Sequence, residues 1–451
     1  MVIEMSDMIL KGGTVVTIDK MRRIIRDGAI AISGNEIEFV GKREEVEGKF
    51  KSDVVIDSKG KVIFPGLINA HDHMFQVMLR NLGVDVSLLE WLKTVIHPAI
   101  SVLKDSEESI HASAMLACLE NIKSGNTFVV DNHYGGNYDA VVEAMIESGI
   151  RGCLARGIYE INVPEAIRES PNVAIPDCER LIRKWHGAAG GRIMVGVAPM
   201  HPCHVSKEML LRAKEVSDSF GVPYHTHTGE SRGDQDLNVK IHGKTDVEFL
   251  NELGILGPRY MSVHSVWVSD DDIKNMARAG VHVVHNPVSN MYLGSGAAKI
   301  PEMREAGINI ALGSDGPASN NNQDLIQSMK FAACLHKLNK LDPAIIRAQD
   351  VLDMATINGA RALGLENEIG SLEAGKKADI IIVDMEKPNI APVHDLVASL
   401  VYCANGSDVD TVIIDGRIVM KNREVLTIDE REVLKKGNEV DGEIQRRLME
   451  K

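Results

Sequence analysis

Hydrophobic and polar positions change their spacing twice along this chain. Near the N-terminus, short apolar runs alternate with polar positions and turn residues, and Gly34-Asn35 marks a hairpin between two such runs. The same pattern returns near the C-terminus, where Asp415-Gly416 separates two alternating runs. Both ends therefore predict strands of one small β-sandwich domain. Its predicted limits are residues 1–62 and 366–428.

Between these two ends, predicted strands alternate with amphipathic helices, which is typical of parallel βα units. The predicted strands are Gly66–His71, Thr127–Asp131, Ile150–Arg156, Arg192–Pro199, Val222–His227, Tyr260–His264, Val281–His285 and Ile308–Ser314. Eight strands are the number that closes a (β/α)8 barrel. We therefore predict an α/β fold, with a distorted (β/α)8 TIM barrel over residues 63–365 and a C-terminal helix over 429–451.

Composition narrows the choice of partners. The 451 residues include 50 Lys and Arg against 64 Asp and Glu, a net charge of −14, so neither nucleic acid nor an anionic membrane is an expected partner. No segment approaches eighteen unbroken apolar residues, and the N-terminus lacks a signal-like apolar core. The six cysteines form no CxxC pair. We expect a cytoplasmic protein with a small-molecule partner, and a homo-oligomer is compatible with the sequence.

The segment FPGLINAHDHMFQVMLR begins as a buried strand and ends on two histidines. His71 and His73 are two residues apart, so on an extended segment both imidazoles point to the same side and can bind one metal ion. The alternative is that they end the strand and bond to the backbone. Because the chain has 16 histidines, such pairs also arise by coincidence.

Further candidate ligands end other predicted strands. His227 ends the fifth strand, His264 the sixth, and Asp315 follows the eighth, and the carboxyl ends of barrel strands meet at one mouth. Glu230, three residues after His227, is then placed to overhang a metal ion. His225 shares a face with His227 and competes for the ligand role, but we expect it inside the barrel.

Three imidazoles and one carboxylate without cysteine suit Zn²⁺ or Fe²⁺ rather than Ca²⁺ or Mg²⁺. We expect one divalent transition metal, with zinc favoured and iron as the alternative, because the fourth strand offers no lysine to bridge a second ion. Such a metal lowers the pKa of bound water from about 15.7 to around 7, so hydroxide is available at neutral pH. Other histidines, including His201 and His204, are expected to be structural.

Six segments, in this order, resemble the signature segments of the amidohydrolase superfamily over nearly the whole chain: PGLINAHDH, HTHTGE, VHSVWVSDDDI, HNPVSNMYLGSG, LGSDGPASNNN and LEAGKKADIIIVD. The resemblance is to the branch that contains triazine hydrolases, 8-oxoguanine deaminase and methylthioadenosine/S-adenosylhomocysteine deaminases. It implies metal ligands at His71, His73, His227 and Asp315, a proton shuttle at Glu230 and a second catalytic group at His264.

Two departures from that branch bear on the substrate. Where adenosine-type deaminases carry a glutamate that holds ribose hydroxyls, this chain has Ile100, and where they carry a histidine after Ala-Pro it has Met200. A ribose buried against Ile100 would lose a hydrogen-bond acceptor, which costs about 1 to 3 kcal/mol. This argument predicts that a free base or a triazine is preferred over a nucleoside.

We therefore expect a metal-dependent aminohydrolase that removes an amino group from an aromatic nitrogen heterocycle of purine, pyrimidine or s-triazine type and releases ammonia. Asp315 would accept a proton from the hydroxide, Glu230 would protonate the ring, and His264 would stabilise the oxyanion. Alternatives are a nucleoside deaminase, hydrolysis of a cyclic amide, displacement of an amine or halide from a triazine, or a non-enzymatic metal-binding scaffold. The predicted substrate-binding residues are Gln76, Trp91, Arg156 and Asn290.

Overall fold

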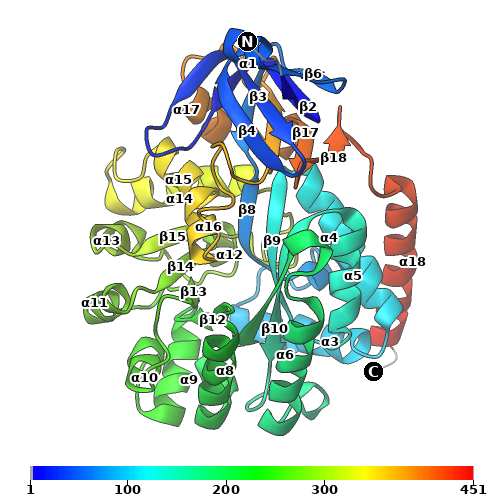
Figure 1. Ribbon diagram of the computed structural model, residues 1–451. Coiled ribbons are helices and arrows are strands. Elements are labelled where there is room, and N and C mark those ends of the chain that lie inside the picture. The colour runs from blue at the N-terminus through cyan, green and yellow to red at the C-terminus, as the bar shows by residue number, and fades with distance from the viewer. Residues whose placement is uncertain (1–3, 450–451) are drawn as a thin grey trace.

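The larger part of the molecule is a nearly closed barrel of eight parallel strands that follow one another in sequence order (Figure 1). The computed structural model describes residues 4–449. The barrel strands are β8 (Leu67–Asp72), β9 (Asn126–His133), β10 (Arg151–Ile158), β11 (Ile193–Pro199), β12 (Tyr224–Thr228), β13 (Tyr260–His264), β14 (His282–His285) and β15 (Asn309–Leu312). All eight predicted strands are present, and their ends differ from the prediction by at most two residues. The predicted barrel is therefore confirmed.

Helices surround the barrel and connect its strands. They are α4 (Glu107–Lys123), α5 (Tyr138–Ser148), α6 (Pro171–Trp185), α8 (Lys207–Phe220), α9 (Arg232–His242), α10 (Asp246–Glu252), α11 (Asp270–Ala279), α12 (Pro287–Tyr292), α13 (Ile300–Glu305), α14 (Leu325–Lys340), α15 (Ala348–Met354) and α16 (Ile357–Ala362). Their ends follow local sequence signals. In α11, Ser269 and Asp272 form a capping box, and Gly280 ends the helix with a left-handed φ of 73°.

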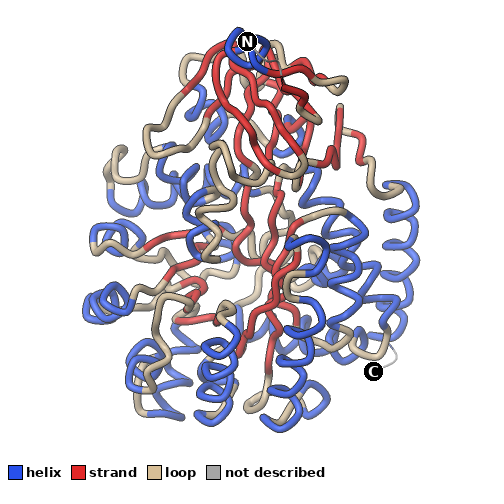
Figure 2. Tube along the Cα trace, viewed as in Figure 1, coloured by secondary structure: helices blue, strands red, loops and turns tan. Residues whose placement is uncertain are grey.

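A smaller mixed sheet lies at one end of the barrel and joins both ends of the chain (Figure 2). Its strands are β2 (Met8–Val16), β3 (Ile24–Ser33), β4 (Glu36–Lys42), β6 (Val55–Asp57), β7 (Lys61–Pro65), β16 (Ile380–Asp384), β17 (Val409–Ile414), β18 (Arg417–Lys421) and β19 (Glu424–Val425). Strand β7 connects the two groups, because it pairs with β2 on one side and β16 on the other. Both predicted hairpins are present, between β3 and β4 and between β17 and β18.

Shorter elements complete the fold. They are β1 (Glu4–Met5), β5 (Phe50–Lys51), α1 (Arg43–Lys49), α2 (Leu88–Trp91), the π-helix η2 (Leu92–Ile96), α3 (His97–Leu103), α7 (Ala188–Gly191), α17 (Leu396–Tyr402), and the 3-10 turns η1 (Met74–Leu79), η3 (Glu165–Ile167), η4 (Pro202–His204) and η5 (Gly406–Asp408). The predicted C-terminal helix is α18 (Glu430–Met449), which packs on α4 and pairs Lys123 with Glu430 at 2.7 Å. Residues 1–3 and 450–451 of the predicted segments lie outside the described residues.

The barrel closes at its carboxyl end through hydrogen bonds between β8 and the segment after β15. The backbone N–H of Asp315 donates to the carbonyl of His71 at 3.0 Å, and the N–H of Ser314 donates to Oδ1 of Asn69 at 2.9 Å. Closure of the barrel therefore brings two segments some 240 residues apart in sequence into direct contact. This contact places Asp315 beside the histidines of β8.

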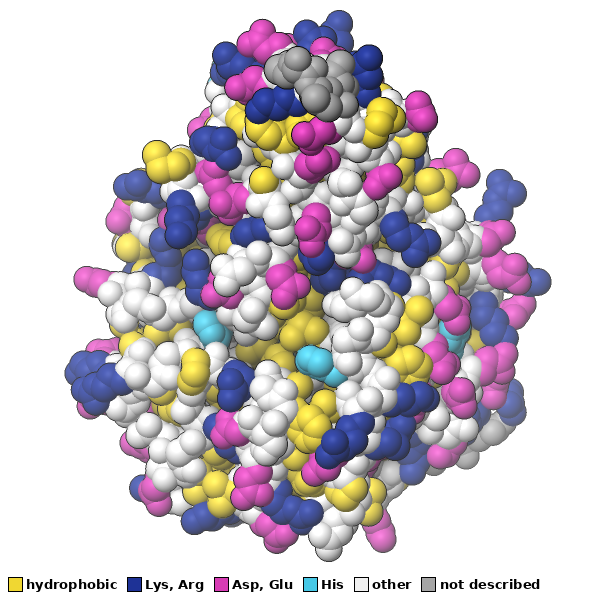
Figure 3. Space-filling view, in the orientation of Figure 1, with side chains coloured by type: hydrophobic (Ala, Val, Ile, Leu, Met, Phe, Trp, Pro, Cys, Tyr) yellow, Lys and Arg dark blue, Asp and Glu magenta, His cyan; other side chains and the backbone are white. Residues whose placement is uncertain are grey.

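Figure 3 shows cationic and anionic side chains interspersed over the visible face rather than gathered by sign. Across residues 4–449, no helix combines the length and the apolar character needed to cross a membrane. All six cysteines are free thiols.

Candidate active site

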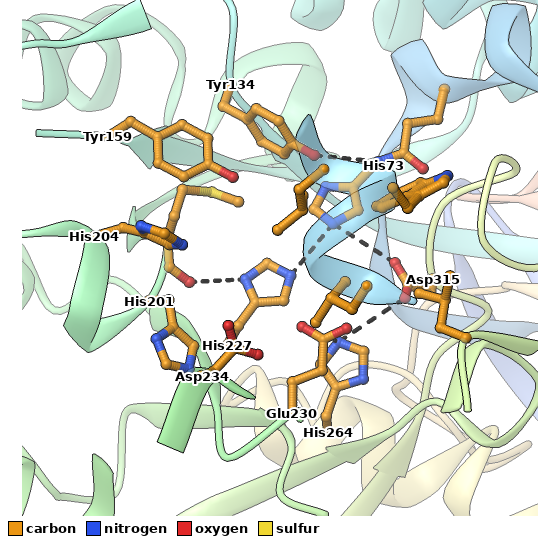
Figure 4. A pocket seen from close by; sticks show the side chains of 16 residues that line it. His73, Tyr134, Tyr159, His201, His204, His227, Glu230, Asp234, His264 and Asp315 are labelled. Atoms are coloured by element: carbon orange, nitrogen blue, oxygen red, sulfur yellow. Dashed lines mark hydrogen bonds and ion pairs between the residues drawn. The ribbon is translucent and has the colours of Figure 1, made fainter. Parts of the chain in front are cut away.

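A cavity lies at the carboxyl ends of the barrel strands (Figure 4). Active sites of barrels of this kind lie at this end. Seven of the residues predicted from sequence line it: His73, Gln76, Trp91, His227, Glu230, His264 and Asp315. The mouth of the barrel therefore does bring the predicted groups together.

The predicted metal ligands form one buried cluster, which we call the metal cluster: His71, His73, His227 and Asp315. Nε2 of His71 lies 3.3 Å from Oδ1 of Asp315, and Nε2 of His73 lies 3.6 Å from the same oxygen. Nε2 of His227 lies 3.3 Å from Nε2 of His73. Four ligand atoms from β8, β12 and the end of β15 thus converge.

The hydrogen bonds behind the metal cluster fix which nitrogen faces inward. Nδ1–H of His73 donates to the carbonyl of Asn132 at 2.6 Å, and Nδ1–H of His227 donates to that of Met200 at 2.8 Å. Burial lowers the pKa of His73 to about 3, so its ring is neutral. The Nε2 lone pairs of the two rings face each other, an arrangement that a cation between them stabilises and that is usual for metal-bound histidine. The residues therefore fit a divalent metal ion.

His225 lies behind the metal cluster rather than in it. Its Nε2 is 3.3 Å from Nδ1 of His71, and its Nδ1 is 3.3 Å from the side-chain nitrogen of Asn132. The ring is fully buried and stacks on His71 with 5.0 Å between centroids. This position is the one expected from the sequence, inside the barrel and in support of a ligand.

Glu230 lines the cavity close to His227 and His264. Burial raises the pKa of its carboxyl group well above the usual value, and the nearby charges of Asp234 and Asp315 raise it further. A carboxyl group that keeps its proton near neutral pH can act as a general acid. Oε2 of Glu230 lies 3.6 Å from Nε2 of His264, so these two groups face the same small volume.

His264 is held by Asn290. Nδ1 of His264 lies 2.8 Å from Oδ1 of Asn290, so the ring donates this proton and presents Nε2 to the cavity. Burial lowers the pKa of His264 to about 4. Both His264 and Asp315 have left-handed backbone φ angles, 71° and 62°, which are rare for these residue types and occur at functional sites. Asn290 had been predicted to bind substrate, but it does not line the cavity. Its side chain contacts His264 instead.

Arg156 is not at the cavity, contrary to the predicted substrate-binding role. Its side chain is 1% exposed and forms ion pairs with Glu169 at 2.6 Å and Asp177 at 3.2 Å. Its guanidinium also lies 4.5 Å from the ring centre of Tyr138. The alternation of a strand predicts only that a side chain faces one side or the other, and here the long side chain is directed to these partners.

Replacing Arg156 with methionine should therefore lower stability much more than activity. We expect a loss of about 2 to 4 kcal/mol in the free energy of unfolding, because two carboxylates lose a buried partner, and a change in kcat/KM below about threefold. Urea unfolding and steady-state kinetics measure both. Arg180→Met is the matched control, since Arg180 is exposed and its ion pairs are worth below about 1 kcal/mol. If Arg156→Met left stability unchanged and lowered kcat/KM tenfold, the original prediction that Arg156 binds substrate would be supported.

Ile100 also lies outside the cavity wall. It is 2% exposed, belongs to the hydrophobic core and sits in α3, against Gly135. The sequence argument against a ribose assumed that Ile100 faces the substrate, so that argument does not hold. Met200 does line the cavity, next to His201.

Several polar residues of the cavity wall were not predicted from sequence: Tyr134, Tyr159, His201, His204 and Asp234. The sequence positions of three of them could have indicated a place near the site. His201 and His204 follow the carboxyl end of the fourth barrel strand, and Asp234 lies four residues after Glu230. The histidines had been expected to be structural because neither has a partner at ligand spacing in the sequence.

The sequence matches the family model described as "Amidohydrolase family" over residues 62–419. That range covers the whole barrel and, in the smaller sheet, strands β16 and β17. The chain belongs to the amidohydrolase family. The resemblance predicted from the six sequence segments is thereby confirmed.

Two characterised groups of relatives match nearly the full chain. A 5'-deoxyadenosine deaminase from Methanosarcina mazei is 40% identical over 444 residues, 98% of this chain and 100% of that protein. A 5-methylthioadenosine/S-adenosylhomocysteine deaminase from Syntrophomonas wolfei is 40% identical over 433 residues, 96% of this chain and 97% of that protein. With the site above, this similarity makes the chain an aminohydrolase that acts on carbon–nitrogen bonds, as predicted.

Solved structures with the same fold contain zinc. An adenosine deaminase from Xanthomonas campestris with bound zinc superposes with a TM-score of 0.94 at 28% identity, covering 99% of this chain and 100% of that one. An atrazine chlorohydrolase from Arthrobacter aurescens, complexed with zinc, superposes with a TM-score of 0.90 at 25% identity. The match covers 96% of this chain and 100% of that one. Zinc is thus present in two solved structures with this fold.

Proposed function

We propose that this protein deaminates adenosine-type nucleosides with a modified 5′ position, namely 5′-deoxyadenosine, 5′-methylthioadenosine and S-adenosylhomocysteine, and releases ammonia. One observation carries the proposal: relatives named for these substrates are 40% identical over at least 96% of the chain. The cavity supports it, because it combines a metal cluster, a buried acid and a free histidine nitrogen in one small volume.

The metal cluster would hold one zinc ion, which supplies hydroxide at neutral pH. Glu230, whose pKa burial raises well above its usual value, would donate a proton to the purine ring nitrogen next to the reacting carbon. Asp315 accepts a proton from the attacking water. His264, neutral before reaction, would take up that proton at Nε2, which lies 3.9 Å from Oδ2 of Asp315, and would donate a hydrogen bond to the developing oxyanion. It would then pass the proton to the departing amino group, which leaves as ammonia.

The cavity wall away from the metal cluster suits a ribose. Tyr159, His204 and Asp234 present polar groups there, whereas Leu88, Leu92 and Leu293 supply apolar surface. Nδ1 of His204 is buried without a hydrogen-bond partner among the described residues. Trp91 likewise has its indole N–H unpaired at the cavity, and a ligand acceptor would satisfy it. Gln76 donates to the hydroxyl of Tyr134 at 3.2 Å and so fixes that ring at the wall.

A second candidate is hydrolytic displacement on an s-triazine ring. The superposition on the zinc-containing atrazine chlorohydrolase supports it. The same attacking water and the same proton donor would serve either reaction. Lower identity, 25% against 40%, places it second.

A substrate panel tests the proposal. We expect kcat/KM for 5′-deoxyadenosine, 5′-methylthioadenosine and S-adenosylhomocysteine to exceed that for adenine, guanine, cytosine and aminotriazines by at least about tenfold, because the nucleosides bring hydroxyl groups to the polar wall. Ammonia release, followed with purified zinc-loaded protein, gives the comparison. A free base or a triazine that leads the panel would replace the proposal with the second candidate or with a base deaminase.

A further inference from the structure

A second group of metal-type donors lies beside the cavity, separate from the metal cluster. It consists of His201, Cys203 and Asp234, whose ligand atoms all lie within 4.8 Å of one another. All three side chains are buried, and His201 and Asp234 face the cavity in the lower left of Figure 4. None of them takes part in the proton transfers of the deamination, although Asp234 also lies in the wall assigned to the ribose. We propose that these residues, the His201 cluster, form a second binding site for a divalent transition metal ion.

His201 is oriented as a metal-binding histidine. Its Nε2 lies 2.9 Å from Oδ2 of Asp246, and its Nδ1 lies 3.0 Å from the sulfur of Cys203. Nδ1 also accepts the backbone N–H of Cys203 at 3.3 Å, a hydrogen bond that a metal ion would replace. A carboxylate on the far nitrogen is the usual support of a ligand histidine, because it orients the ring and strengthens the other nitrogen as a ligand. Asp246 is itself fixed, since its Oδ2 accepts the backbone N–H of Gly229 at 2.7 Å.

Asp234 has comparable support. The hydroxyl of Ser231 donates to its Oδ2 at 2.7 Å, while the backbone N–H of Asp234 donates back to the Ser231 hydroxyl at 3.2 Å. These bonds hold the carboxylate in the first turn of α9 and leave its remaining lone pairs free. Ligand carboxylates in metal sites are usually held by hydrogen bonds of this kind.

The charge balance around the His201 cluster also favours a cation. Asp246, 0% exposed, is paired with His201, whereas Asp234, 2% exposed, forms no ion pair within residues 4–449. Buried charges are normally paired or bound to metal. Burial alone would lower the pKa of His201, but the Asp246 carboxylate raises it well above its usual value, so this place attracts positive charge. A divalent ion at Nδ1 would supply that charge in place of a proton.

The donor types indicate which ion would bind. Imidazole, thiolate and carboxylate suit Zn²⁺ or Co²⁺, whereas Ca²⁺ and Mg²⁺ prefer oxygen alone. Zinc binds nitrogen at about 2.0 to 2.1 Å and sulfur at about 2.3 Å, so Nδ1 of His201 and Sγ of Cys203 would separate by roughly half an ångström on binding. Burial raises the pKa of the Cys203 thiol, and the metal would displace its proton to solvent.

The site would connect the loops after two neighbouring strands. His201 and Cys203 lie at η4, after β11, whereas Asp234 lies in α9, after β12. It shares no ligand with the metal cluster, which contains no cysteine. Three protein ligands leave a fourth position for water, and because His201 and Asp234 line the cavity this position faces it.

Cobalt titration tests the proposal with the full-length protein. Protein stripped with a chelator and titrated with Co²⁺ under reducing conditions should bind two ions per chain. A thiolate-to-cobalt charge-transfer band in the near ultraviolet reports the His201 cluster alone, because only this cluster contains sulfur. We expect the band to persist in His71→Ala/His73→Ala and to be lost in Cys203→Ser.

Two further measurements keep the result interpretable if Cys203→Ser folds poorly. Asp246→Asn removes the charge behind His201 but keeps an acceptor for Gly229, and it should weaken cobalt binding at this site about 10- to 100-fold. The controls Cys153→Ser, at a buried cysteine outside the cluster, and Cys334→Ser, at an exposed one, should retain the band. A single bound ion without the band, a band that survives Cys203→Ser, or one that Cys334→Ser removes would overturn the proposal.

Discussion

Replacing Glu230 with glutamine is expected to lower kcat by at least about a hundredfold while the fold and the metal content stay unchanged. Glutamine has nearly the same size and can still donate a hydrogen bond, but it cannot transfer a proton. The effect should be large because, in the proposed mechanism, the Glu230 carboxyl group supplies the proton for the ring nitrogen, and burial raises its pKa. Steady-state kinetics with the best nucleoside of the panel measure the loss.

The matched control is Glu215→Gln, on the exposed side of α8. This variant should match the parent in kcat and KM. Circular dichroism and metal analysis of Glu230→Gln distinguish a lost proton transfer from a lost fold or a lost ion. Deamination by Glu230→Gln at the parental rate would show that another group delivers the proton, and the assigned mechanism would then be wrong.

The double variant His71→Ala/His73→Ala is expected to lose one zinc ion per chain and to show no measurable deamination. Both imidazoles present Nε2 to Asp315, at 3.3 Å and 3.6 Å, so their removal leaves the site with one histidine and one carboxylate. Two protein ligands are too few for a catalytic zinc site, which usually has three or more. Zinc content after dialysis against a weak chelator gives the measurement.

His111→Ala/His394→Ala serves as the matched control, because it also removes two histidines but neither lies at the cavity. It should keep the parental zinc content and activity. The expected loss of one zinc ion concerns the metal cluster only. A second ion, bound at the His201 cluster, would remain in both double variants. Undiminished zinc binding in His71→Ala/His73→Ala would refute the ligand assignment.

The sequence alone was sufficient to predict the barrel and the metal cluster. Strands and helices follow from the period of apolar positions, and all eight strands were located within two residues. The paired orientation of His71 and His73 follows from the alternation of a strand, a purely local property. The carboxyl ends of parallel barrel strands meet at one mouth, so residues at the ends of strands five, six and eight could be assigned to one site.

Only the tertiary structure decided which side chains form the cavity wall. Arg156 lies on a predicted strand as His227 does, yet Glu169 and Asp177 bind it away from the cavity. Ile100 packs into the core, and Asn290 holds His264 instead of facing the substrate.

Conversely, His201 is paired with Asp246, which lies 45 residues further along the chain and 2.9 Å away, and the metal site proposed above depends on this contact. Such contacts depend on how loops from different strands pack and on which partner satisfies each buried charge. Because these are long-range interactions, no local pattern in the sequence encodes them.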